Sequence, residues 1–192
     1  SWRLSAALTG PLSERMMKTL LSVAGVDPAA GAGALLDVRI FNRLGFHGAA
    51  VLTAVTAQNT RAVQDVQILP ARFVLKQFEV LAADLHIAGV KVGMLGGAEG
   101  IRALKEILVR TKAVPQVVDP VFRSSSGYWL IRKGMTPAFL RVIQNRATLI
   151  TPNISEAEQM AGQKIRDVAD QKTAAHYISE LAGIPCLLKG GH

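Results

Sequence analysis

Two carboxylates and one lysine follow different apolar stretches of this sequence, and their residue types suit one kind of chemistry. The residues are Asp119, Glu156 and Lys189. Carboxylate oxygens can hold hydrated Mg²⁺, and a lysine can place a fixed positive charge beside a phosphoryl group in transfer. Taken alone, Asp119 before a proline is typical of a turn, and Glu156 is typical of an acidic residue in the first turn of a helix. Together, the three residues indicate phosphoryl transfer.

Residues that a packed core does not explain also follow the other apolar stretches. They are Gly25 and Asp27, the run 58–60, the pair 93–94 and the run 151–153. In a parallel sheet the carboxyl ends of the strands lie at one edge, where open α/β sheets bind their ligands. We therefore expect these segments to converge on one cleft.

The elements that would position these residues alternate between short apolar runs and helical patterns. Strands are expected at 19–24, 49–57, 89–95, 116–118, 148–150 and 185–188, and helices at 33–44, 70–83, 101–108, 137–145, 155–161 and 168–181. Repeated βα units of this length predict an α/β fold with a mainly parallel central sheet and right-handed crossovers. The second helix should bury an apolar stripe through Phe73, Phe78, Leu81 and Leu85.

One domain is expected over residues 17–192. Residues 1–16 lack the alternation of strand and helix patterns that characterises the rest of the chain, and we expect them to be a poorly ordered N-terminal extension.

Composition excludes several classes of protein. No apolar run approaches the roughly 18 residues of a membrane span, so no membrane partner is expected. The formal net charge is +8, but the basic residues are scattered and not interleaved with aromatics, which argues against a nucleic-acid partner. A lone cysteine, Cys186, excludes an intrachain disulfide and fits a reducing, cytoplasmic location.

Two familiar phosphate-binding motifs and a histidine metal site are also excluded. The glycine-rich run 31–36 lacks the Gly-Lys-Ser/Thr of a P-loop and the third small residue of a dinucleotide fingerprint. The histidines show no ligand spacing; they are His47, His86, His176 and His192.

Six ordered motifs carry a resemblance to a known family. They are AGVDPAAGAG (24–33), TAVTAQNT (53–60), VKVGML (90–95), VDPV (118–121), ITPNISEAE (150–158) and LKGGH (188–192). Together they closely resemble the hydroxymethylpyrimidine/phosphomethylpyrimidine kinases of thiamine biosynthesis, members of the ribokinase-like superfamily. The resemblance implies a three-layer α/β/α fold that is C-terminally incomplete here. It also implies ATP and Mg²⁺ as cofactors, a cytoplasmic homodimer, and phosphorylation of 4-amino-5-hydroxymethyl-2-methylpyrimidine and then of its monophosphate.

The resemblance also implies roles for individual residues. Substrate binding falls to Gly25, Asp27, Ala32, Gln58, Met94 and Val121. Of these, Gln58 would read the aminopyrimidine edge, because an amide can donate and accept at once. Lys189 and Asp119 would be catalytic, Asn153, Glu156 and Lys189 would lie near the nucleotide, and Asp119 and Glu156 near the metal.

Two departures from the family pattern bear on activity. Ser125 stands where the family commonly has a lysine, which weakens a phosphate contact unless Arg123 replaces it. The family's later Gly-Thr-Gly-Cys segment, which forms the anion hole, has no counterpart after His192. Since such stabilisation often dominates catalysis, we expect this polypeptide alone to turn over very poorly or not at all.

Three hypotheses therefore stay open. The chain is a pyrimidine kinase lacking its C-terminal part, a pyrimidine-binding module without kinase activity, or a related kinase acting on pyridoxal.

Overall fold

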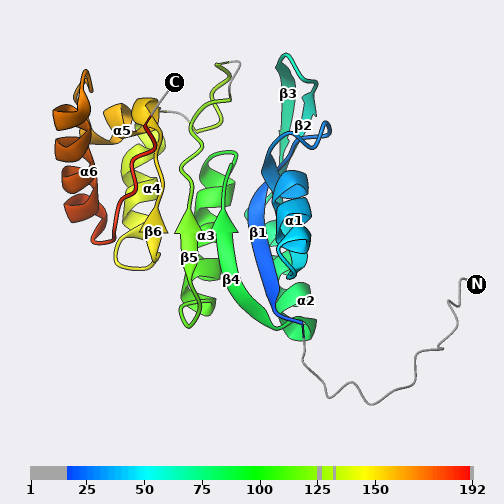
Figure 1. Cartoon of the computed structure of the whole chain (residues 1–192). Helices are drawn as coiled ribbons and strands as arrows, with labels where there is room; N and C mark the ends of the chain where they lie inside the picture. The colour runs from blue at the N-terminus through cyan, green and yellow to red at the C-terminus, as the bar shows by residue number, and fades with distance from the viewer. Residues whose placement is uncertain (1–16, 125–126, 132, 191–192) are drawn as a thin grey trace, which may run out of the picture.

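The computed structural model describes residues 17–124, 127–131 and 133–190. Within them runs one six-stranded sheet in the order β3-β2-β1-β4-β5-β6 (Figure 1). The strands are β1 (Thr19–Val26), β2 (His47–Gln58), β3 (Val63–Ile68), β4 (Ile87–Val92), β5 (Gln116–Val118) and β6 (Leu149–Ile150). Every neighbouring pair is parallel except β2 with β3. The expected α/β fold with a mainly parallel sheet is confirmed.

Helices cover both faces of this sheet. They are α1 (Gly33–Arg43), α2 (Ala71–Asp84), α3 (Ala98–Arg110), α4 (Thr136–Ile143), α5 (Ile154–Ala161) and α6 (Val168–Ala182), with a short 3-10 turn η1 (Lys133–Met135) before α4. Helix α1 packs on β1 and β2, and Figure 1 shows it on the face opposite α2 and α3. None of the helices in the described ranges is both long and apolar enough to cross a membrane.

The alternation of β1 explains this layering. Leu21 and Val23 are fully buried in the main core, which also receives side chains from α2, α3, α4 and α6. The residue between them, Ser22, points the other way, because its hydroxyl donates to Asp37 of α1 at 2.6 Å. Successive side chains of a strand face opposite sides of a sheet. Leu21 and Val23 of β1 therefore face the main core, and Ser22 faces α1 on the other side.

Strand β3 is an element that the sequence reasoning missed. It pairs antiparallel to the end of β2, and all six of its residues are exposed or half-buried. A strand without a buried face shows no hydrophobic alternation, which is the signal used to recognise one. Strand β3 is the outermost strand of the sheet. It pairs with the C-terminal half of β2, which ends at the cavity residue Gln58.

The expected stripe of the second helix was wrong at one position. Phe73 is 53% exposed, and the fully buried side chains of α2 are those of Val74 and Phe78. The spacings 74, 78, 81 and 73, 77, 81 are both compatible with one face of a helix, so periodicity alone could not separate them.

The strand expected at 185–188 also requires correction. This segment runs parallel to β6 but forms only isolated bridges, from Cys186 to Ile150 and from Lys189 to Asn153. Its backbone hydrogen bonds are regular, with Leu187 N–H donating to the carbonyl of Ile150 at 2.9 Å. Because β6 has only two residues, no continuous ladder can form beside it.

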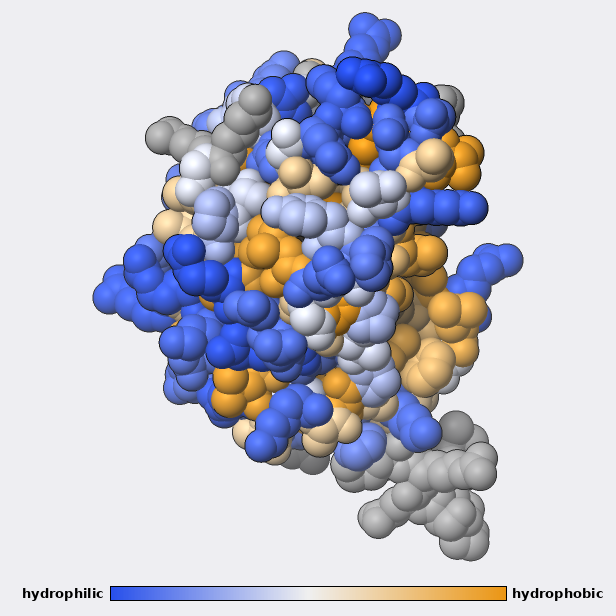
Figure 2. Space-filling model, turned by 90° about the vertical axis from the view of Figure 1, so that its left-hand side faces the viewer, coloured by the Kyte–Doolittle hydropathy of each residue, from blue (hydrophilic) through white to orange (hydrophobic). Residues whose placement is uncertain are grey.

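This end of the sheet is shown in Figure 2, where hydrophilic side chains surround smaller apolar areas. Leu187 is one of the exposed apolar residues, at 57%.

The extension expected at residues 1–16, together with Ser125 and His192, lies outside the described residues.

Gly100 in α3 supplies a stability test. A Cβ added there would overlap the backbone carbonyl of Leu95. Alanine is favoured over glycine within helices by about 1 kcal/mol, but overpacking of this kind costs about 1–3 kcal/mol. We expect Gly100→Ala to lower the free energy of unfolding measured by urea titration. Gly134→Ala is the matched control, since nothing lies near its added Cβ; equal effects of the two changes would contradict the close approach at Gly100.

Candidate active site

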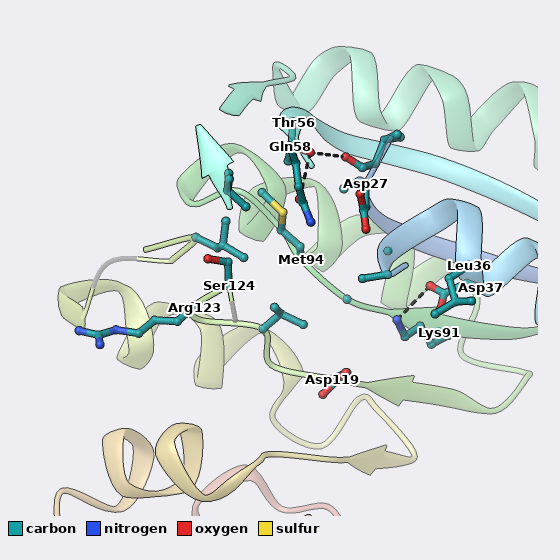
Figure 3. A pocket seen from close by; sticks show the side chains of 18 residues that line it. Asp27, Leu36, Asp37, Thr56, Gln58, Lys91, Met94, Asp119, Arg123 and Ser124 are labelled. Carbon is teal, nitrogen blue, oxygen red and sulfur yellow. Dashed lines mark hydrogen bonds and ion pairs between the residues drawn. The ribbon is translucent and has the colours of Figure 1, made fainter. Parts of the chain in front are cut away.

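A cavity of about 450 Å³ opens at the carboxyl ends of the central strands (Figure 3). Its walls come from the loop after β1, the start of α1, the ends of β2 and β4, and the segment after β5. The lining residues are Gly25, Val26, Asp27, Ala32, Gly33, Leu36, Asp37, Thr56, Gln58, Val63, Lys91, Gly93, Met94, Asp119, Val121, Arg123, Ser124 and Leu130. Parallel pairing brings these segments together, as expected for the ligand edge of an α/β sheet.

All six residues predicted to bind the substrate line this one cavity. They are Gly25, Asp27, Ala32, Gln58, Met94 and Val121. Asp119 lines it as well, whereas Asn153, Glu156 and Lys189 lie beyond its wall. The structure therefore brings together the predicted substrate set and joins it to the predicted phosphate side through Asp119.

The loop after β1 is organised by the side chain of Asp27. Its carboxylate is almost buried and accepts the N–H groups of Ala29 at 2.9 Å and Gly31 at 3.1 Å. Gly33 then starts α1 with φ of +61°, and a side chain there would overlap the carbonyl of Gly25. Only glycine combines that backbone angle with that close approach. Asp27 thus shapes the loop as well as facing the cavity.

Gln58 enters the cavity from the end of β2. The hydroxyl of Thr56 lies 2.8 Å from the carbonyl oxygen of Val26 and 3.2 Å from Oε1 of Gln58. The hydroxyl carries one proton, so it donates to one of these two oxygens at a time. The nitrogen of the Gln58 amide points into the cavity in Figure 3. An amide nitrogen in this position can donate to a ring nitrogen, and the second lone pair of Oε1 can accept from an amino group.

The predicted phosphate side is built around Asp119 and Lys189. Nζ of Lys189 lies 2.6 Å from Oδ1 of Asp119, and Thr151 Oγ1 lies 3.5 Å from the same oxygen. Asp119 follows β5, Thr151 follows β6, and Lys189 comes from the segment beside β6. Three segments distant in sequence thus meet at one carboxylate.

Asn153 and Glu156 form a capping box at the start of α5. Oδ1 of Asn153 accepts the N–H of Glu156 at 2.9 Å, and Oε2 of Glu156 accepts the N–H of Asn153 at 2.8 Å. The pair satisfies backbone donors that a helix start otherwise leaves without partners. The fold therefore uses both residues structurally, which is compatible with a phosphate bound at this helix end.

The surroundings of Glu156 also shift its pKa. Burial disfavours its ionised form and raises its pKa to about 7, and the nearby negative charge of Asp119 adds to the rise. The N–H of Asn153 and the ammonium of Lys189 oppose it. A divalent cation would favour the ionised form of both carboxylates. The donor set of Asp119 and Glu156 thus fits Mg²⁺, which keeps several waters and takes one or two protein carboxylates.

The chain is similar to known proteins over most of its length. The sequence model of the family described as Phosphomethylpyrimidine kinase matches residues 27–192. The chain belongs to this family. A hydroxymethylpyrimidine/phosphomethylpyrimidine kinase of Aquifex aeolicus is 39% identical over 176 residues, which cover 90% of this chain and 68% of that protein. A thiamine biosynthesis bifunctional protein of Geobacter sulfurreducens is 39% identical over 91% of this chain and 36% of its own length.

Solved structures of kinases share the fold. A phosphomethylpyrimidine kinase from Clostridium difficile 630 superposes with a TM-score of 0.77 and 37% identity, covering 91% of this chain and 76% of that one. A pyridoxal kinase from Staphylococcus aureus in complex with pyridoxal gives a TM-score of 0.79 and 33% identity, covering 91% and 65%. The expected family and its ribokinase-like architecture are confirmed, and the chain spans about two thirds of the Aquifex enzyme.

In this member of the phosphomethylpyrimidine kinase family, the side chain of Arg123 is stacked on an aromatic ring. Its guanidinium lies 3.5 Å from the centroid of the Trp129 ring, and Figure 3 shows the side chain extending away from the cavity centre. A stacked guanidinium of this kind gains cation–π energy. Ser125 is outside the described residues, so the weakening of the phosphate contact expected there stays a prediction.

Sequence reasoning missed three charged or polar residues at this site. Asp37 and Lys91 form an ion pair at the cavity wall, with Nζ 2.9 Å from Oδ2, and Ser22 donates to the same oxygen. Each residue lies inside a helix or strand, not at a strand end. A polar residue at an inward position of an apolar strand was the available signal, because a buried Lys needs a partner.

The raised pKa of Glu156 predicts a pH-dependent stability. A carboxyl that keeps its proton up to about pH 7 when folded, but loses it near its ordinary pKa when unfolded, makes stability fall as pH rises between those values. Glu156→Gln keeps an oxygen acceptor for the capping box and removes the titration. We expect it to gain roughly 1–3 kcal/mol relative to wild type between pH 5 and pH 8 in urea unfolding. A constant difference across that range would contradict the assignment.

Proposed function

We propose that the cavity binds the aminopyrimidine ring of 4-amino-5-hydroxymethyl-2-methylpyrimidine, and that the chain takes part in its ATP-dependent phosphorylation and in that of its monophosphate. One observation carries the proposal: six residues assigned to the substrate from sequence line a single cavity, although they come from four separate stretches of the chain. The family membership supports the reaction type.

Each residue of the proposed site has a defined task. Gln58 would read the polar edge of the ring, Asp27 would hold the loop against the substrate, and Met94 would pack on its apolar face. Gly25 supports the last role, since a Cβ there would lie 2.7 Å from Sδ of Met94. A larger residue at 25 would displace the methionine from the cavity wall.

Phosphoryl transfer needs positioning and charge neutralisation more than covalent chemistry by the protein. Lys189 would bring positive charge to the transferring group, and Asn153 and Glu156 would lie beside the nucleotide phosphates. Mg²⁺, held by Asp119 and Glu156, supplies further charge neutralisation when bound. Fitting this assignment, Lys189 is already paired with Asp119 at 2.6 Å, so the cation and the carboxylate are oriented before any ligand enters.

The organisation of the protein follows the same proposal. Residues 17–192 would form one kinase domain with residues 1–16 as an extension, acting as a cytoplasmic homodimer. Sedimentation velocity at several concentrations tests the homodimer directly.

Gln58→Ala tests the pyrimidine assignment. Removing the amide leaves polar atoms of the bound ring without partners, which costs about 1–3 kcal/mol, so we expect affinity to fall about tenfold to a hundredfold. Isothermal titration with hydroxymethylpyrimidine measures it. Gln67→Ala is the control, because Gln67 is exposed on β3. An unchanged affinity in Gln58→Ala would sink the assignment.

Pyridoxal is the alternative substrate, favoured by the likeness to a pyridoxal kinase in complex with pyridoxal. A coupled assay of ATP consumption with each compound separates the two. Although turnover by this polypeptide alone is expected to be very low, we expect it to be higher with hydroxymethylpyrimidine than with pyridoxal. Pyrimidine binding without ATP consumption would instead support a binding module, and preference for pyridoxal would overturn the proposed substrate.

A further inference from the structure

Lys91 is a charged side chain on the central sheet to which the proposed reaction assigns no task. It is the next-to-last residue of β4 and faces the same side of the sheet as α1, since its Nζ lies 2.9 Å from Oδ2 of Asp37. Ser22 of β1 donates to that oxygen at 2.6 Å. Asp37 is therefore fixed from two strands and in turn holds the ammonium in place.

The ion pair belongs to the cavity and not to the core. Both partners line the cavity, and their side chains are 27% and 13% exposed. Figure 3 shows Lys91 and Asp37 joined at the cavity wall. Facing the cavity leaves both charged groups partly hydrated, which lowers the desolvation cost of the pair, and keeps them accessible to a ligand.

The ammonium of Lys91 has donors to spare. It carries three N–H groups, and the described residues offer it one partner, Asp37. Gly93 keeps the approach open, since a Cβ at that position would lie 3.1 Å from Nζ. A bound anion could therefore take the remaining donors without displacing a side chain.

The other charges at the cavity are already engaged. The carboxylate of Asp27 accepts two loop N–H groups, and Asp119 is paired with Lys189. Arg123 is the second cation among the described lining residues, and its guanidinium lies over Trp129. Among the described lining residues, Lys91 is thus the cation best placed to meet negative charge on a ligand inside the cavity.

We propose that Lys91 binds the phosphate of the pyrimidine monophosphate, with Asp37 as its positioning residue. This inference rests on the proposed function and deepens it. A site that accepts first a neutral alcohol and then a dianion needs a positive charge that is balanced while the alcohol is bound. Asp37 supplies that balance, and the spare donors of Lys91 supply charge-assisted hydrogen bonds to the phosphate.

The test compares two ligands in four proteins by isothermal titration. The ligands are hydroxymethylpyrimidine and its monophosphate, and the proteins are the wild-type chain, Lys91→Gln, Asp37→Asn and Lys76→Gln. Hydrogen bonds to charged groups predict that Lys91→Gln weakens monophosphate binding about tenfold or more and leaves the neutral ligand within about twofold. Asp37→Asn should keep the preference for the monophosphate. Lys76→Gln is the charge-matched control on the exposed side of α2 and should change neither affinity.

The possible outcomes separate this inference from the proposed function. If the wild-type chain binds neither ligand, the proposed function fails and the inference fails with it. If it binds both, and Lys91→Gln changes both affinities equally or neither, the function stands and the role of Lys91 is overturned. The double variant Asp37→Asn/Lys91→Gln keeps a neutral hydrogen-bonding pair, so a selective loss of monophosphate binding in it supports the inference even if Lys91→Gln alone unfolds.

Discussion

Parallel pairing of β1 with both β2 and β4 is the constraint on which the site depends. It places the carboxyl ends of three strands side by side, so that short loops from each reach the same cavity. The strands can run parallel because helices cross over between them and bury both sheet faces. Ser22 links the packing of the sheet to the site, since this residue of β1 donates a hydrogen bond to Asp37 at the cavity wall.

The polar groups around the cavity are arranged in pairs before any ligand is present. Asp37 is matched by Lys91 and Asp119 by Lys189, while Asp27 is matched by loop amides. Such preorganisation avoids the cost of gathering charges during the reaction. It also keeps a strongly charged site from destabilising the fold, because each carboxylate has a donor within hydrogen-bond distance.

Sequence reasoning reached the fold class, most elements and the residues at the strand ends. Those residues were visible because a glycine, an acid or an amide directly after an apolar run has no place in a core. Asp37 and Lys91 were missed because each looks like an ordinary charged residue of a helix or strand, and only the packing of α1 on the sheet joins them. Strand β3 was missed for a related reason, since it is held by pairing with β2 and not by a buried face. The local sequence pattern therefore identified residues at the ends of strands. The pairing of Asp37 with Lys91 and of β3 with β2 depends on tertiary contacts, which the local pattern does not show.

The attachment of the segment 185–189, which lies beside β6, depends on a residue of the cavity. The segment is held on the sheet by a few backbone hydrogen bonds, by the packing of Cys186 and Leu188 against the core and by the Lys189–Asp119 pair. The Asp119 end of that pair lies at the cavity. Any ligand that competes for Asp119 or attracts Lys189 changes how firmly the segment is attached. Occupancy at the centre of the sheet is thereby linked to the local opening free energy at its edge, and the amide protons of Leu187 and Lys189 would exchange at rates that report on what the cavity contains.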